Sequence, residues 1–110
     1  MKILTPDQSA HYHEKGYCSA EGLVDASWLA RLNAVTQDFI DESRGITASN
    51  ARFDLEPDHT AVQPRLRRLN APVDQHETYW EFASTGPFAD IAEDLLGPNV
   101  KFHHSKLNFK

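Results

Sequence analysis

The sequence lacks paired cysteines, a long apolar run and a signal-peptide pattern, three features that define common classes of small protein. Its one cysteine, Cys18, has no partner for an internal disulfide, which is typical of a reducing compartment. No apolar run approaches the roughly 20 residues of a membrane span. The start, Met1 to Leu4 followed directly by Thr5-Pro6, is too short and too mixed for a signal peptide. We therefore expect a soluble, cytoplasmic protein with no membrane partner.

Positive charge is also scarce. The 11 lysines and arginines face 16 acidic residues, which gives a formal net charge of −5. A general nucleic-acid binder needs a net cationic surface, so this class of partner is excluded. The one local exception is the Arg65-Leu66-Arg67-Arg68 run. Its arginines would suit a phosphate group, but pairing with nearby acids such as Asp54, Glu56 and Asp58 is the preferred interpretation.

The rest of the composition fits one small packed domain. Of the 110 residues, 40% are apolar and 25% are charged, so there is room for one core. Helix caps and apolar spacing predict four helices, at about 5–15, 25–45, 74–83 and 85–96. The second helix is the clearest, with an apolar stripe of Trp28, Leu29, Leu32, Val35, Phe39 and Ile40. We expect the helix aromatics to be core residues, namely Trp28, Phe39, Trp80, Phe82 and Phe88.

Two weaker segments lie between the second and third helices. Residues 46–63 have a turn-like composition, which predicts a long surface loop or a weak edge strand near Phe53. Residues 64–69 alternate and predict a strand with Leu66 and Leu69 on opposite faces. The third helix is then expected to begin at a capping box, Asp74-Gln75-His76-Glu77.

The last stretch, 97–110, carries the strongest functional signal. After a Gly-Pro helix stop, alternating residues predict a strand. One face would carry Phe102, His104, Lys106, Asn108 and Lys110, and the other Lys101, His103, Ser105, Leu107 and Phe109. Such a strand suits a wall between a core and a wet cleft, with His104 and Asn108 lining the cleft. No turn or partner strand follows, so we expect an unpaired strand and an unfinished domain.

The histidines and the cysteine do not suggest a metal site. His103 and His104 are adjacent, so in a strand they point to opposite faces and cannot share one ion. We expect His11 and His13 at the surface, and Cys18 as a buried, inert thiol. We predict no catalytic residue and no metal ligand in this chain.

Three stretches of the sequence resemble the phytanoyl-CoA dioxygenase family. They are Leu4-Thr5-Pro6-Asp7-Gln8 with Glu14-Lys15-Gly16-Tyr17, then Pro64-Arg65-Leu66-Arg67-Arg68-Leu69-Asn70-Ala71-Pro72, and then the segment from Asp94-Leu95-Leu96-Gly97-Pro98 to Lys110. The likeness spans nearly the whole chain but only the N-terminal part of a much longer family domain. The last segment is the most specific of the three.

The resemblance implies an Fe(II)- and 2-oxoglutarate-dependent dioxygenase, an oxidoreductase acting on a small aliphatic or acyl substrate. The implied fold is α+β: a helical buttress plus the first strands of a double-stranded β-helix, a jelly-roll or cupin-like barrel. Residues 1–110 would be the N-terminal segment of this single domain, truncated before the barrel is complete. The family's lysine at the end of this strand looks like Lys110, which would help to hold 2-oxoglutarate.

The chain departs from the family at the iron site. The family binds Fe(II) through His-x-Asp and a distant His, but none of the six histidines here has Asp or Glu two positions later. We therefore expect these 110 residues to be inactive alone. One alternative is a small non-catalytic interaction domain that pairs through its C-terminal strand. Another is a histidine-based metal protein. The oligomeric state is left open by the sequence.

Overall fold

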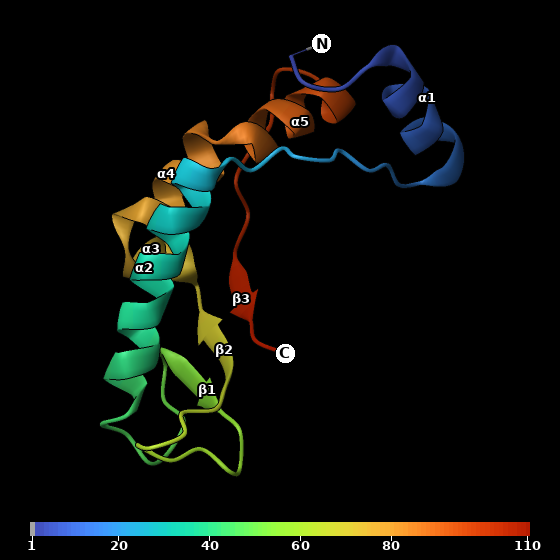
Figure 1. Cartoon of the computed structure of the whole chain (residues 1–110). Coiled ribbons are helices and arrows are strands. Elements are labelled where there is room, and N and C mark those ends of the chain that lie inside the picture. The colour runs from blue at the N-terminus through green and yellow to red at the C-terminus, as the bar shows by residue number, and fades with distance from the viewer. Residues whose placement is uncertain (1) are drawn as a thin grey trace.

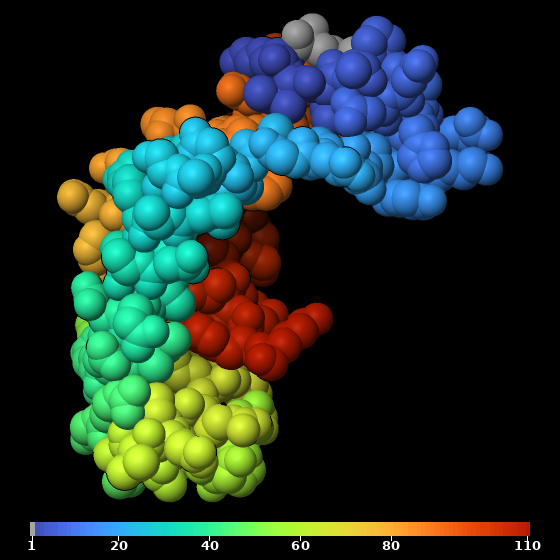
Figure 2. Space-filling model, in the orientation of Figure 1, coloured from blue at the N-terminus to red at the C-terminus, as the bar shows by residue number. Residues whose placement is uncertain are grey.

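The computed structural model describes residues 2–110 as an elongated molecule measuring 48 × 27 × 24 Å. Helices α1 and α5 lie at one end, and a small sheet lies beside α2 at the other (Figure 1). Figure 2 shows a hooked outline, with the C-terminal residues on its concave side. None of the helices in residues 2–110 is long and apolar enough to cross a bilayer. The helices are α1 (Pro6–Lys15), α2 (Ala26–Ser43), α3 (Pro72–Gln75), α4 (Glu77–Thr85) and α5 (Pro87–Leu96).

Helix α1 begins and ends where the sequence predicts. The Thr5 hydroxyl accepts the backbone N–H of Gln8 at 3.1 Å, and Gln8 Oε1 accepts the backbone N–H of Thr5 at 2.9 Å. These two bonds complete the predicted capping box. Gly16 ends the helix in the left-handed conformation, with φ of 85°.

Helix α2 confirms most of its predicted apolar stripe. Asp25 caps it by accepting the backbone N–H of Trp28 at 2.8 Å. Four stripe residues pack against the core: Leu32, Val35, Phe39 and Ile40. Leu29 does not, because it is 49% exposed. Trp28 takes the inward position against Phe82, and the next residue is turned about 100° around the helix axis.

The sheet is antiparallel, in the order β1-β2-β3. Its strands are β1 (Phe53–Leu55), β2 (Leu66–Asn70) and β3 (Lys106–Asn108). Strand β1 confirms the weak edge strand predicted within residues 46–63. Strand β3 is shorter than predicted, and it pairs with β2. The expectation of a terminal strand with no partner in the chain is therefore wrong, because β2 lies beside it despite the long separation in sequence.

A β-bulge changes which side chains of β2 face the core. Asp54 lies opposite Arg68 but Leu55 lies opposite Leu66, so Arg67 is left without a partner on β1. The extra residue resets the alternation, and Leu66 and Leu69 are both buried in the same core. The predicted placement of these two leucines on opposite faces is wrong for this reason.

The segment between β2 and α4 also differs from the prediction. Helix α4 begins at Glu77, with His76 as its cap: His76 Nδ1 accepts the backbone N–H of Thr78 at 3.1 Å. The residues expected to open this helix instead form the short helix α3, which follows Ala71 in the left-handed conformation, with φ of 44°. Helix α5 begins at Pro87, two residues after the predicted start, and proline suits this first position.

The core lies between the sheet and helices α2 and α4. Its buried members are Phe39, Phe53, Leu66, Leu69 and Tyr79. Trp28 and Phe82 are half-buried, whereas Trp80 and Phe88 are 46% and 50% exposed. The prediction that these last two are core residues is wrong, because they lie on faces of α4 and α5 that the sheet does not cover. Cys18 is half-buried rather than fully buried.

Candidate functional site

The sheet face opposite the core is polar and carries the candidate site. Arg68 on β2 lies opposite Asn108 on β3 and Asp54 on β1. Arg68 Nε donates to Asn108 Oδ1 at 3.1 Å, and Arg68 Nη1 lies 3.7 Å from Asp54 Oδ2. Asn70 Nδ2 donates to Asp54 Oδ1 at 3.3 Å. A polar network therefore crosses all three strands, and the strand register assembles it.

The predicted alternation of the last strand is present from His104 to Lys110. The side chains expected to line a cleft, His104, Asn108 and Lys110, are exposed. The intervening Leu107 and Phe109 are half-buried and pack against the core. The strand thus separates an apolar side from a polar side, although nothing among residues 2–110 covers the polar side of β3.

Lys110 lines a hollow of about 440 Å³ at the end of β3. Arg65 and Glu56 line the same hollow, and Ile40 and Phe109 are among its apolar lining residues. The hollow therefore combines two cations with apolar lining residues, and its one carboxylate, Glu56, is paired with Arg67. Such a lining suits a small anion with a short carbon chain.

The arginines of the basic run pair with acids, as the sequence predicts. Arg67 Nε lies 3.3 Å from Glu56 Oε1, which raises the pKa of Arg67. Arg65 lies 3.9 Å from Asp58, and Arg68 pairs with Asp54 as described above. The bond from Arg68 to Asn108 is the part that sequence analysis missed. No local signal could have revealed it, because it depends on the pairing of β2 with β3.

His103 and His104 are not on opposite faces of a strand. They precede β3, and their ring centroids are 4.5 Å apart with the planes tilted by 36°. The prediction failed because the regular strand begins only at Lys106. Within residues 2–110 no group of three or more His, Cys, Asp or Glu side chains is placed to hold a metal ion.

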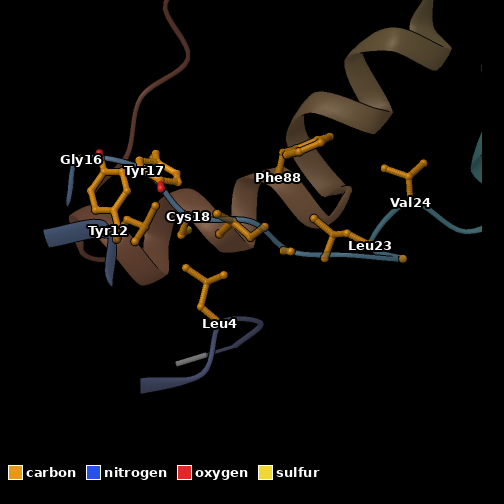
Figure 3. Close-up of a pocket in the computed structure, with 12 residues that line it drawn as sticks. Leu4, Tyr12, Gly16, Tyr17, Cys18, Leu23, Val24 and Phe88 are labelled. Atoms are coloured by element: carbon orange, nitrogen blue, oxygen red, sulfur yellow. The ribbon is translucent and has the colours of Figure 1, made fainter. Parts of the chain in front are cut away.

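Two apolar hollows lie away from the sheet. The larger, of about 640 Å³, is formed between α1, the following connector and α5 (Figure 3). Leu4, Tyr12, Leu23 and Phe88 line it, and Cys18 contributes its thiol side chain. The second, of about 540 Å³, is lined by α4, α5 and the 100–102 segment. The sequence did not predict either hollow, since both depend on how α5 packs against other segments.

Comparison with known proteins gives one informative similarity. No family model matches the sequence, and no solved structure matches it. A protein of Stutzerimonas stutzeri named "Probable alpha-ketoglutarate-dependent hypophosphite dioxygenase" is 24% identical to this chain over 104 residues. Those residues are 94% of this chain but only 36% of the relative, so the chain spans well under half of the relative's length. The chain is thus similar to a 2-oxoglutarate-dependent dioxygenase.

Proposed function

We propose that this chain is part of a non-haem Fe(II)- and 2-oxoglutarate-dependent dioxygenase of the phytanoyl-CoA dioxygenase family. The observation that carries the proposal is the similarity to a dioxygenase over 94% of the chain. The amphipathic strand β3 supports it, because Leu107 and Phe109 pack against the core while the intervening polar side chains are exposed. In the complete domain the helices would buttress a double-stranded β-helix that contains the present sheet.

The reaction proposed for the whole protein couples oxidative decarboxylation of 2-oxoglutarate to hydroxylation of a small substrate. A small aliphatic or acyl compound is the substrate class that the family resemblance favours. The name of the similar protein adds hypophosphite, a small oxyanion, as a second class. The site's cations favour an anionic substrate or cosubstrate of either class.

The residues present do not fit an iron site. The sequence has no His-x-Asp or His-x-Glu, and the described residues 2–110 hold no group of three potential ligands. In the proposed function the iron ligands come from residues outside these 110.

The residues present do suit the carboxylates of 2-oxoglutarate. The proposed role of Lys110 is to hold one carboxylate with its ammonium group, in the hollow that it shares with Arg65. His104 and Asn108 do not line this hollow, and their proposed place is along the exposed side of β3 that leads to Lys110. An ammonium facing a carboxylate binds it more tightly as the rest of a domain excludes water.

The complete open reading frame that encodes these residues provides the test. Its purified product, supplied with Fe(II) and 2-oxoglutarate, is expected to form succinate, and Lys110→Ala is expected to raise the KM for 2-oxoglutarate about tenfold or more. Lys101→Ala, which removes an exposed lysine outside the hollow, is the matched control. A reading frame without a His-x-Asp or His-x-Glu would contradict the proposal.

A second candidate is a non-catalytic domain that pairs through β3. Strand β3 is at the edge of the sheet, so one row of its backbone groups has no strand partner within residues 2–110. This function predicts a concentration-dependent dimer or a complex with another strand. A stable monomer in sedimentation experiments over a wide concentration range would contradict it.

A further inference from the structure

The amide of Asn108 has only one possible orientation. Arg68 Nε lies 3.1 Å from the Asn108 side chain. A guanidinium has hydrogen-bond donors and no acceptor, so the atom that faces it must be the amide oxygen. The NH₂ group of Asn108, with its two donors, therefore does not face Arg68, and the side chain is exposed.

Arg68 is itself held from its other side. Its Nη1 lies 3.7 Å from the carboxylate of Asp54, and that carboxylate also accepts a bond from Asn70. The side chain of Arg68 is 33% exposed, whereas that of its neighbour Arg67 is 56% exposed. The network thus holds Arg68 from two sides and leaves it less exposed than its neighbour Arg67.

The exposed row of β3 consequently presents mainly donors. Lys106 and Lys110 lie two residues on either side of Asn108, and both are exposed. Two ammonium groups then flank an amide whose oxygen already accepts a bond from Arg68. Such a row repels cations and matches a carboxylate or a phosphorus oxyanion.

We propose that Arg68 is a positioning residue that orients Asn108 for binding a small oxyanion on the exposed face of β3. The inference deepens the function proposed above and rests on it for the identity of the anion. That anion is the carboxylate of 2-oxoglutarate or a phosphorus oxyanion substrate, and these two share the recognition chemistry.

Titration of the ¹⁵N-labelled 110-residue chain tests the proposal without turnover. The Asn108 side-chain NH₂ resonances are followed while 2-oxoglutarate or hypophosphite is added at constant ionic strength, with chloride as the control anion. We expect saturable shifts with at least one of the two oxyanions, and the stronger binder identifies the source. No shift beyond that given by chloride would overturn the proposal.

Two substitutions of neighbouring arginines separate positioning from charge. Arg68→Met is expected to weaken oxyanion binding about tenfold, because Asn108 loses its fixed orientation. Arg67→Met, with the same change in charge on the same strand, is expected to change binding less than about threefold. Arg68→Lys keeps a positively charged hydrogen-bond donor at this position and is expected to retain part of the oxyanion affinity that Arg68→Met loses. Equal losses in Arg68→Met and Arg67→Met would contradict the proposed role.

Asn108→Asp separates binding from folding. A carboxylate here accepts from Arg68 in a charge-assisted bond, so the melting temperature is expected to stay the same or to rise. The two donors aimed at the anion are lost and a like charge replaces them, so oxyanion binding is expected to vanish. A folded Asn108→Asp chain that binds like the wild type would overturn the inference.

The outcomes also distinguish this inference from the proposed function. Oxyanion binding that depends on Arg68, together with no 2-oxoglutarate turnover by the complete protein, would leave the site in place and remove the oxygenase. Turnover by the complete protein, with normal oxyanion binding in Arg68→Met, would support the oxygenase and contradict the positioning role of Arg68.

Discussion

The carboxylate of Asp94 accepts the backbone N–H of Leu4 at 2.8 Å. It also accepts the backbone N–H groups of Lys2 and Ile3, at 2.6 and 2.8 Å. These bonds attach the N-terminal segment to α5 and seat Leu4, which is only 4% exposed. Because donors from Leu4, Lys2 and Ile3 favour the charged carboxylate, the pKa of Asp94 lies below its ordinary value.

This attachment should be sensitive to acid. A carboxyl group with a lower pKa in the folded state stabilises the fold above its unfolded pKa, and this stabilisation is lost as the pH falls through the folded pKa. We expect the Leu4 amide to lose protection from hydrogen exchange, corrected for intrinsic rates, below about pH 4. Asp94→Asn should lower this protection roughly tenfold already at pH 7.

Asp90→Asn is the control for the Asp94 experiment. The Asp90 carboxylate makes only a 3.4 Å contact with the Lys2 ammonium and accepts no backbone N–H of residues 2–4. Its substitution should leave the Leu4 amide protected. Equal loss in both variants would mean that Asp94 does not hold the segment.

A second prediction concerns the hydroxyl pair of Thr36 and Tyr79. The two oxygens are 2.7 Å apart, and Tyr79 is buried in the core. Tyr79→Phe should lower the free energy of unfolding by about 1 kcal/mol in urea denaturation, because it leaves the Thr36 hydroxyl without its partner. Tyr17→Phe, at an exposed position, should change this free energy by less than about 0.5 kcal/mol.

Burial also raises the pKa of Tyr79, although the hydrogen bond to Thr36 opposes this shift. A group with a raised pKa stabilises the fold below its unfolded pKa, and this contribution is lost as the pH rises through the folded pKa. The wild type should therefore lose stability above about pH 10 more steeply than Tyr79→Phe does. Parallel pH profiles for the two proteins would contradict this expectation.

Features that depend on near neighbours were predictable from the sequence. The capping box of Thr5 and Gln8 and the helix end at Gly16 involve groups a few residues apart, so their side-chain chemistry is sufficient. The pairing of the arginines with acids was predictable for another reason. Acids are abundant in this chain, and the ones involved lie on the neighbouring strand and loop.

Features that depend on distant segments were not predictable. The bulge at Arg67 is set by how β1 meets β2, and an apolar pattern does not encode it. The sequence did not reveal that β3 pairs with β2, because three helices separate these two strands along the chain. At the candidate site, the alternation of exposed residues from His104 to Lys110 followed from the sequence. The bond between Arg68 and Asn108 did not, because it joins residues 40 positions apart.

A third prediction tests the consequence of the bulge. Leu69 is completely buried, in the same core as Leu66. Leu69→Ala should lower the free energy of unfolding by about 2–5 kcal/mol, since it leaves a cavity in the centre of the sheet. Leu96→Ala removes the same atoms from a residue that is 72% exposed, and should cost less than about 1 kcal/mol. Similar losses of unfolding free energy in the two variants would mean that Leu69 does not pack in the core.

The last prediction concerns Gly86, where α4 ends and α5 begins. Its φ of −78° is open to any residue, so the backbone angle does not require glycine here. The constraint is space: an added Cβ would meet the backbone carbonyl of Phe82 and come within 3.2 Å of its ring. That carbonyl already accepts the Gly86 N–H at 3.0 Å, so the junction cannot accommodate a methyl group without moving α5 relative to α4.

Gly86→Ala should therefore lower the free energy of unfolding by about 1–3 kcal/mol. The matched control is Gly45→Ala, since a Cβ there would lie 3.6 Å from the Glu42 carbonyl, an ordinary contact. Gly45→Ala should leave stability unchanged or raise it by up to about 1 kcal/mol, because alanine has less freedom in the unfolded chain. Urea denaturation of the two variants should thus give effects of different sign or size. An equal effect would show that the junction of α4 and α5 tolerates a side chain, and that its close packing does not fix the angle between the two helices.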